Sequence, residues 1–205
     1  MRPAGRPSGQ VANTPVVIAD YDPHWPAMYE EERARIVEAI GPWLIDIQHV
    51  GSTSVPGLAA KPVVDIMPGV RTLADDREFI GPMEALGYSY LPVDEDDIPE
   101  RRYFRRGDPR LFHVHIAEVG GEFWTKHLAF RDYLRAHPES AAEYAALKRR
   151  LAAEYGSDRL GYTKAKSPFI LGIMEKAAAA PGPSSPSAER GIPGQPASRI
   201  PGSAK

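Results

Sequence analysis

The segment from residue 44 to residue 70 constrains the fold of this chain more than any other, because it places an acid inside an apolar stretch. Residues 44–50 have the composition of a strand, a turn rich in Gly, Ser and Pro follows, and residues 62–70 return to a strand-like pattern. Asp65 lies in that second stretch. An ionised carboxylate in a buried strand is costly unless it is paired or bound to a metal. We therefore expect Asp65 to have one of these partners.

Strand-like and helix-like segments alternate along the chain, and helices dominate after residue 121. The pattern predicts a strand over 16–19, then a helix with Asp22 as its N-cap and Pro23 as its first residue. Further predicted elements are a helix over 73–86, strands over 88–91, 102–106 and 111–118, and helices over 123–136, 141–155 and 168–178. Strands mixed with helices, followed by a helical C-terminal block, favour an α/β (α+β) fold in which helices flank a sheet.

The two ends of the chain differ in composition from its middle. Residues 181–205 consist mainly of Pro, Gly, Ser and Ala, and residues 1–15 are similar. Such segments bury too little apolar surface to offset the entropy lost when they become ordered. We therefore expect disordered tails over 1–15 and 181–205 around one folded domain over 16–180.

Charge and composition disfavour several classes of function. The net charge is −2 at pH 7, but both tails are basic, which leaves the middle of the chain with a net charge of about −6. An acidic body does not favour long nucleic acids, whose binding requires many phosphates to be neutralised. The chain has no cysteine and no apolar run long enough to span a membrane. We expect a cytoplasmic protein without a secretory signal or membrane partner.

The turn after residue 50 has the residue types of an anion-binding loop. Gly51 lets the backbone adopt a positive φ and approach a phosphate closely, and successive backbone N–H groups form a concavity for an anion. Ser52 and Thr53 add hydroxyl donors, and Lys61 precedes the strand that carries Asp65. We expect a phosphate to bind here. The alternatives are an ordinary turn and a solvated lysine.

Other polar residues are candidates for the same site. Arg102 and Arg105 lie in a strand-like segment, where a solvated face is the alternative to a phosphate contact. His127 and Arg131 share related faces of one predicted helix with Trp124, which we expect to lie in the core. Further candidates are Glu118 as a metal ligand, and Lys164 and Lys166 as phosphate contacts unless they are surface lysines.

Four strings in the chain resemble the signature of the GrpB family. They are Ser-Thr-Ser-Val-Pro-Gly-Leu-Ala-Ala-Lys-Pro at 52–62, Val-Val-Asp-Ile at 63–66, Phe-His-Val-His at 112–115 and Trp-Thr-Lys-His-Leu-Ala-Phe-Arg-Asp-Tyr-Leu at 124–134. The resemblance spans about residues 16–176 and implies a nucleotidyltransferase-like mixed sheet. The family also occurs as a domain appended to dephospho-CoA kinases.

The resemblance implies a metal-dependent chemistry, from which this chain departs at one position. In similar nucleotidyltransferases a Gly-Ser turn precedes a strand with two carboxylates at alternate positions, which hold a divalent metal while a nucleoside triphosphate is attacked. Gly51, Ser52 and Asp65 match that pattern, but the second carboxylate is replaced by Met67. A thioether is a poor ligand for hard cations such as Mg²⁺, which prefer oxygen.

Two histidines offer a replacement for the missing carboxylate. His113 and His115 are two residues apart in a predicted strand and therefore project from the same face. If that strand lies beside the strand of Asp65, the three residues form a cluster of two histidines and one carboxylate. The alternative is that the histidines only hydrogen-bond to Asp65.

The function expected from these residues is a metal-dependent nucleotidyltransferase that uses Mg²⁺ or Mn²⁺, a nucleoside triphosphate and an unidentified small-molecule acceptor. Gly51 and Ser52 would hold the β- and γ-phosphates, Asp65 the metal, and Lys61 with Arg102 or Arg105 would add positive charge. The alternative is a module that binds a nucleotide or a precursor of CoA without catalysis, which the absence of a second carboxylate favours.

Removal of residues 1–14 and 181–205 should leave the folded domain intact, because segments of this composition bury little apolar surface. We expect the melting temperature of the shortened chain to stay within a few degrees of that of the full chain, measured by thermal denaturation. A much larger loss of stability would show that the tails pack against the domain.

Overall fold

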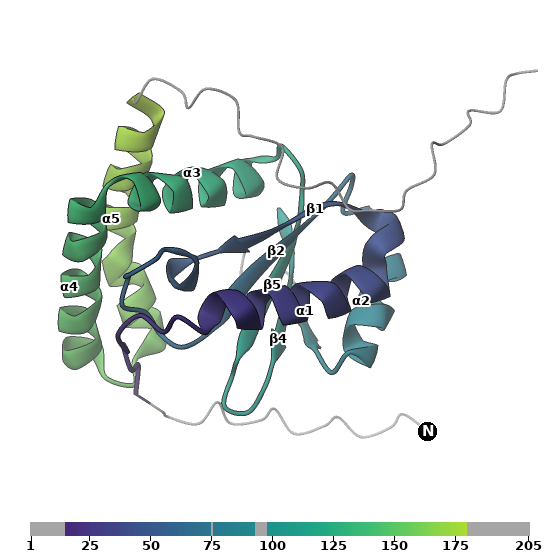
Figure 1. Cartoon of the computed structure of the whole chain (residues 1–205), viewed down its shortest axis with the longest axis horizontal. Coiled ribbons are helices and arrows are strands. Elements are labelled where there is room, and N and C mark those ends of the chain that lie inside the picture. Colours follow the sequence, from purple (N-terminus) through teal and green to yellow (C-terminus); the bar gives the residue numbers. More distant parts are fainter. Residues whose placement is uncertain (1–14, 75, 93–97, 180–205) are drawn as a thin grey trace, which may run out of the picture.

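A computed structural model describes residues 15–74, 76–92 and 98–179 as a sheet flanked by helices (Figure 1). Its main elements are α1 (Trp25–Ile40), β1 (Leu44–Val50), β2 (Val64–Val70), α2 (Arg77–Ala85), β3 (Ser89–Leu91), β4 (Arg101–Arg106), β5 (Phe112–Glu118), α3 (Glu122–Ala136), α4 (Pro138–Tyr155) and α5 (Arg159–Ala179). The predicted α/β class with a helical C-terminal block is confirmed. Apart from Pro15, the predicted tails lie outside the described residues.

The five strands form one mixed sheet in the order β1-β2-β5-β4-β3. Only β2 and β5 are parallel, while the other neighbouring pairs are antiparallel. In the β2–β5 register Asp65 lies opposite His113, and in the β5–β4 register His113 lies opposite Arg105. Because side chains alternate between the two faces of a sheet, these three residues project from one face.

Helices α1 and α2 cover the other face of the sheet (Figure 1). Apolar residues recur along α1 at helical spacing, so that Ile36 and Ile40 are fully buried together with Phe79 and Met83 of α2. One acid, Glu32, is buried on the same side of α1, where Arg106 forms an ion pair with it. A buried carboxylate requires such a partner, and this pair ties α1 to β4.

The face that carries Asp65 is covered by the C-terminal helices. Trp124 of α3 packs on Met67, and the prediction that Trp124 lies in the core is confirmed. Helices α4 and α5 pack against α3 and against each other, and these three helices form a block at one end of the sheet (Figure 1). Leu134, Tyr144 and Ile173 join the three helices in a second apolar cluster.

Two predictions for the N-terminal part of the domain are wrong. Residues 16–19 contain a single bridge, between Ala19 and Ala60, rather than a strand, since the other backbone bond of this range runs from the Val16 N–H to the Gly156 carbonyl outside the sheet. The N-cap of α1 is His24, not Asp22. The Asp22 carboxylate instead accepts a hydrogen bond from the His24 backbone N–H at 2.9 Å, so the helix begins two residues later than predicted.

Several predicted helix boundaries also differ from the structure. The second helix starts at Arg77 and not at residue 73, since the Leu73 N–H is bound by the Glu118 carboxylate at 2.8 Å. Pro138 begins α4 instead of separating two helices, because proline lacks the N–H that the first helical turn leaves unpaired. The last helix contains Pro168 and begins at Arg159, where packing against α3 and α4 outweighs the helix-breaking residues.

Strand β1 forms one edge of the sheet, and its backbone is partly covered. A register shift lies between Leu44 and Asp46. The Asp46 carboxylate accepts a hydrogen bond from the Ile47 N–H at 2.7 Å, and Arg131 of α3 donates to the His49 carbonyl at 3.1 Å. Bulges, side chains and helices at such positions protect an edge strand from pairing with another chain.

Candidate functional site

The turn after β1 brings the backbone of Gly51 against the side chain of Asp65. Gly51 has a φ of 69°, as predicted, and its carbonyl accepts hydrogen bonds from the backbone N–H and the hydroxyl of Ser54 at 3.3 and 2.6 Å. A Cβ atom at this position would overlap with the Asp65 carboxylate, whose Cγ would lie only 3.0 Å away. Gly51 is therefore required both by its backbone angle and by the closeness of the acid.

The two histidines of β5 lie beside Asp65, as the spacing predicted. His113 Nδ1 is 3.1 Å from Asp65 Oδ1, and His115 Nε2 is 3.7 Å from the same oxygen. Burial alone would raise the pKa of Asp65, but the hydrogen bonds and charges of the two histidines outweigh that effect and hold the pKa below its ordinary value. Asp65 is therefore ionised at neutral pH.

Hydrogen bonds define which ring nitrogens carry protons. Arg101 Nη1 lies 2.6 Å from His115 Nδ1, and because a guanidinium only donates, this nitrogen accepts. Burial and the charge of Arg101 lower the pKa of His115 to about 3, so its ring is neutral and carries its proton on Nε2. His113 Nδ1 donates to the ionised Asp65 carboxylate, and the buried His113 Nε2 atom has no hydrogen-bond partner among the described residues.

The residues around Asp65 fit a divalent metal in part. Ligand atoms of Asp65, His113 and His115 all lie within 4.8 Å of one another, as a three-ligand site requires. The hydrogen bond from Arg101, however, leaves the proton of His115 on the atom that would bind the metal. Mg²⁺ is commonly held by one or two carboxylates together with phosphate oxygens and water. Asp65 alone meets that need, whereas the three-ligand cluster stays a prediction.

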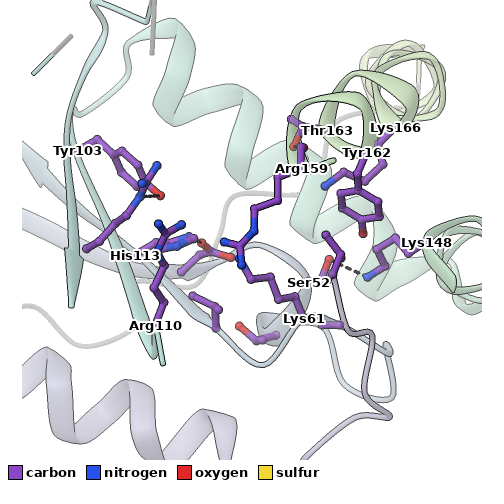
Figure 2. A pocket seen from close by; sticks show the side chains of 16 residues that line it. Ser52, Lys61, Tyr103, Arg110, His113, Lys148, Arg159, Tyr162, Thr163 and Lys166 are labelled. Carbon is purple, nitrogen blue, oxygen red and sulfur yellow. Dashed lines mark hydrogen bonds and ion pairs between the residues drawn. The ribbon is translucent and has the colours of Figure 1, made fainter. Parts of the chain in front are cut away.

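A cavity of about 340 Å³ opens beside these residues (Figure 2). The sheet, the turn, and helices α4 and α5 all contribute to its walls. Among the described residues that line it, Asp65 is the only carboxylate. The lining cations are Lys61, Arg105, Arg110, Lys148, Arg159 and Lys166. Clefts with this excess of one charge concentrate ions of the opposite sign.

Lys148 of α4 links the helical block to the turn. Its Nζ donates to Ser52 Oγ at 2.9 Å and to the Ala59 carbonyl at 2.5 Å, and lies 4.5 Å from the centre of the Tyr144 ring. Because Lys148 occupies the Ser52 oxygen as an acceptor, the Ser52 hydroxyl can donate its own hydrogen to an anion. Burial and the charge of Lys166 lower the pKa of Lys148 to about 7. The other predicted hydroxyl, Thr53, also lines the cavity, 3.0 Å from His49 Nε2.

Sequence reasoning found some of the cations and missed others. Lys61 and Arg105 line the cavity as expected, and so does Lys166, while Lys164 is exposed outside it. Burial and the nearby arginines lower the pKa of Lys61 to about 8. The cations missed are Arg110, Lys148 and Arg159. Each lies outside the matched strings, and only the packing of the helical block against the sheet reveals the positions of Lys148 and Arg159.

Other predicted residues lie away from the cavity. Arg102 projects from the opposite face of the sheet, where its Nε donates to Asp76 at 2.9 Å, so the structure does not bring it to Asp65. His127 does not line the cavity either, and its ring stacks on Phe123 with its Nδ1 2.7 Å from the Phe123 carbonyl. Glu118 lies at the far end of β5 from His113.

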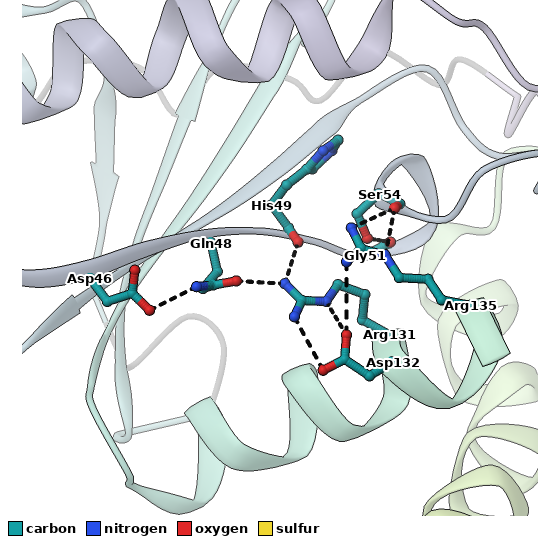
Figure 3. Close-up of polar contacts among 8 residues, drawn as sticks. All are labelled: Asp46, Gln48, His49, Gly51, Ser54, Arg131, Asp132 and Arg135. Carbon is teal, nitrogen blue, oxygen red and sulfur yellow. Dashed lines mark hydrogen bonds and ion pairs between the residues drawn. The ribbon is translucent and has the colours of Figure 1, made fainter. Parts of the chain in front are cut away.

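Arg131 was expected to contact a phosphate. Its guanidinium instead binds the end of β1 next to the turn (Figure 3). Its guanidinium donates to the Gln48 side chain at 2.7 Å and to the His49 carbonyl. One turn further along α3, Arg135 donates two hydrogen bonds to the Ser54 carbonyl, at 3.1 and 2.9 Å. Two arginines of α3 therefore fix the backbone on both sides of Gly51.

Replacement of Gly51 by alanine should be more damaging than the same change at Gly57. Both glycines have a positive φ, of 69° and 78°, so both substitutions strain the backbone. At Gly57 an added Cβ meets nothing within 4 Å, whereas at Gly51 it collides with Asp65. We expect Gly51→Ala to lower the free energy of unfolding by at least about 1 kcal/mol more than Gly57→Ala, measured by urea denaturation. Equal effects would contradict the tight contact with Asp65.

Comparisons with known proteins agree with this architecture. The family model described as GrpB protein matches residues 15–176. UPF0157 protein YqkA of Bacillus subtilis is 42% identical over 163 residues, which make up 79% of this chain and 47% of that protein. A dephospho-CoA kinase of Mycolicibacterium paratuberculosis is 32% identical over 192 residues, which cover 82% of this chain and 47% of the kinase. This chain thus spans about half the length of both relatives.

A solved structure of a protein from another organism has a similar fold. The crystal structure of conserved protein GrpB from Enterococcus faecalis superposes with a TM-score of 0.71 and 35% sequence identity, and covers 78% of this chain and 96% of that one. A family match from residue 15 to residue 176, together with the shared fold, shows that this chain belongs to the GrpB protein family.

Proposed function

We propose that the cavity beside Asp65 binds the phosphates of a nucleoside triphosphate, and that the chain transfers a nucleotidyl group to a small-molecule acceptor. The observation that carries this proposal is the convergence of six cationic side chains on a cavity with one carboxylate in its described lining. Fixed cations placed around a polyphosphate stabilise the negative charge that develops during phosphoryl transfer.

The burial of these cations points to an anionic ligand. Burial lowers the pKa of Lys61, Lys148 and Lys166, which means that their surroundings in the cavity disfavour their charged forms. A polyphosphate in the cavity would restore favourable electrostatic interactions with all three lysines. Ser52 adds a hydroxyl donor in the same wall, and the Lys148–Ser52 hydrogen bond holds it in place (Figure 2).

In the proposed reaction an acceptor oxygen forms a bond to the α-phosphorus. The bond from that phosphorus to the bridging oxygen of the β-phosphate breaks, and pyrophosphate leaves with the electron pair. The acceptor proton passes to His113 Nε2, which lacks a partner and belongs to a residue that lines the cavity. Mg²⁺ or Mn²⁺ held by Asp65 would supply charge neutralisation at the phosphates. Asp65 also keeps the His113 Nδ1 proton in place.

A second candidate function is a binding module without catalysis, for a nucleotide or a precursor of CoA. Met67 favours it, because this residue replaces the second carboxylate, is fully buried against Trp124, and has a thioether, which is a poor ligand for Mg²⁺. Relatives described as dephospho-CoA kinases also contain a region similar to this chain, which covers about half of their length. Both candidates predict binding of a phosphorylated ligand in the cavity, and only the first predicts release of pyrophosphate.

The catalytic proposal predicts that the chain releases pyrophosphate from a nucleoside triphosphate when Mn²⁺ or Mg²⁺ and a pool of small metabolites are present. Asp65→Asn should abolish this release, because the variant loses both the metal ligand and the charge that orients His113. The measurement is a coupled pyrophosphate assay with each of the four nucleotides. Asp20→Asn is the matched control, since that carboxyl is 93% exposed and does not line the cavity.

Binding measurements distinguish the outcomes of this experiment. Without metal, Asp65→Asn should bind tripolyphosphate at least as tightly as the wild type, because it removes a negative charge from the cavity. The metal-dependent gain in affinity should disappear. Tight nucleotide binding with no pyrophosphate release from any nucleotide would favour the binding module, and an undiminished metal effect in Asp65→Asn would contradict the metal site.

Nucleotide affinity should fall as the pH rises from 7.5 to 9. The pKa values of Lys148 and Lys61 are about 7 and about 8, and a bound polyanion raises both, so binding takes up protons in this range. Above its pKa each lysine should weaken binding by up to about tenfold per pH unit. The terminal phosphate, with a second pKa of about 6, is already ionised. Calorimetry in two buffers of different ionisation enthalpy measures the uptake, and a pH-independent affinity would contradict it.

A further inference from the structure

The two histidines beside Asp65 differ in what surrounds their second ring nitrogen. Each ring turns one nitrogen toward Asp65 Oδ1, His113 its Nδ1 at 3.1 Å and His115 its Nε2 at 3.7 Å. The other nitrogen of His115, Nδ1, lies 2.6 Å from Arg101 Nη1. The other nitrogen of His113, Nε2, is buried and has no hydrogen-bond partner in the part of the chain that the structure describes.

The contact with Arg101 permits only one position for the proton of a neutral His115 ring. A guanidinium donates and cannot accept, so Nδ1 accepts and the proton lies on Nε2, the atom that faces Asp65. If Nε2 gave its lone pair to a metal, the ring proton would have to move to Nδ1, and two donors would then meet at 2.6 Å. That arrangement is repulsive. Arg101 therefore prevents His115 from acting as a metal ligand.

Arg101 is held in this position by aromatic rings. The residue is only 9% exposed, and its guanidinium carbon lies 4.3 Å from the centre of the Tyr103 ring and 5.6 Å from that of Phe123. Tyr103 is the register partner of His115, and the two rings stack with their centres 4.8 Å apart and their planes at 12°. The guanidinium and the imidazole thus lie against the same tyrosine, which keeps the donor aimed at Nδ1.

His113 is not restricted in this way. When its Nδ1 gives a lone pair to a metal, its proton can move to Nε2 without meeting another donor among the described residues. The ligand atoms of Asp65, His113 and His115 lie within 4.8 Å of one another, and three protein ligands are the usual set of a catalytic zinc site. The cluster consequently falls short of a zinc site through the proton on His115 alone.

Asp65 itself keeps an oxygen on the side of the turn. Both histidines contact its Oδ1, whereas its Oδ2 faces Gly51. Hard ions such as Mg²⁺ and Mn²⁺ accept one carboxylate together with phosphate oxygens and water, while imidazole nitrogens favour Zn²⁺. A metal that binds Oδ2 would lie where the nucleotide's phosphates are proposed to bind.

We infer that Arg101 determines the metal specificity of the site, because it keeps His115 as a donor to Asp65 and thereby excludes Zn²⁺ from the three-residue cluster. Asp65 is then reserved for an ion that arrives with the phosphates. In this second respect the inference rests on the proposed function. Arg101 is a positioning residue, since it acts through His115 and not by touching the metal.

The first test uses the wild-type full chain and needs no variant. A nitrogen–proton correlation NMR spectrum of the histidine rings shows which nitrogen of each ring carries the proton. We expect the His115 proton on Nε2. A proton on Nδ1, or an even mixture of the two forms, would overturn the inference.

The second test measures the affinity of the full chain for Zn²⁺ alone by calorimetry. Arg101→Met should bind one equivalent of Zn²⁺ at least about tenfold more tightly than the wild type, because His115 can then carry its proton on Nδ1. Arg105→Met is the matched control. It removes a cation from the same face of β4, opposite His113, and should raise the affinity much less. Arg101→Met combined with His115→Phe, which keeps an aromatic ring against Tyr103, should lose the gain.

These outcomes separate the role of Arg101 from the effect of its charge. An equal gain in Arg105→Met, or a gain that persists without His115, would show that any lost cation suffices and would overturn the inference. No gain in an Arg101→Met variant with an unchanged melting temperature would also overturn it.

The inference and the proposed function can fail separately. A His115-dependent zinc gain, together with no metal-dependent binding of tripolyphosphate and no pyrophosphate release by the wild type, would support the exclusion of Zn²⁺ by Arg101 and contradict the proposed function. Pyrophosphate release with Mn²⁺, together with an unchanged zinc affinity in Arg101→Met, would support the proposed function and overturn the inference.

Discussion

The hydrogen bond between Asp65 and His113 is the interaction on which the candidate site depends. It joins the one parallel pair of strands in the described sheet, β2 and β5, at residues that are direct partners in the register. A parallel pair needs a long connection, and here that connection includes α2, β3 and β4. Because β4 returns beside β5, it places Arg105 next to His113. The topology thus supplies the acid, the imidazole and a first cation together.

The C-terminal helices fix the loop between β1 and β2 and add cations to the cavity. Arg131 and Arg135 of α3 bind carbonyls on either side of Gly51, and Lys148 of α4 binds the carbonyl of Ala59. These three hydrogen-bonded cations hold both ends of the loop between β1 and β2 against the helices. The cavity is consequently a property of the whole domain, since half of its cations come from the loop and sheet side and the other half from α4 and α5.

The sequence predicted most reliably those features that depend on residue type and local pattern. The fold class and the positive φ of Gly51 follow from residue types and local pattern. Spacing placed His113 and His115 on one face, and the pairing of β2 with β5 brings them to Asp65. Lys148 and Arg159 could not be found in this way, because their positions depend on how two distant helices pack. Arg102 and Arg131 were predicted as site residues, but the structure places them elsewhere. Their charge suggested phosphate contacts, but Arg102 lies on the other face of the sheet, and Arg131 binds the His49 carbonyl and the Gln48 side chain.

The covered edge at β1 has a consequence for how the molecule behaves at high concentration. A bare strand edge offers a template on which another chain can add a strand, and repeated addition leads to polymers. In β1 the register shift, the Asp46 carboxylate on the Ile47 N–H and the Arg131 guanidinium on the His49 carbonyl interrupt that template. The edge at β1 is thereby unsuited to open-ended assembly.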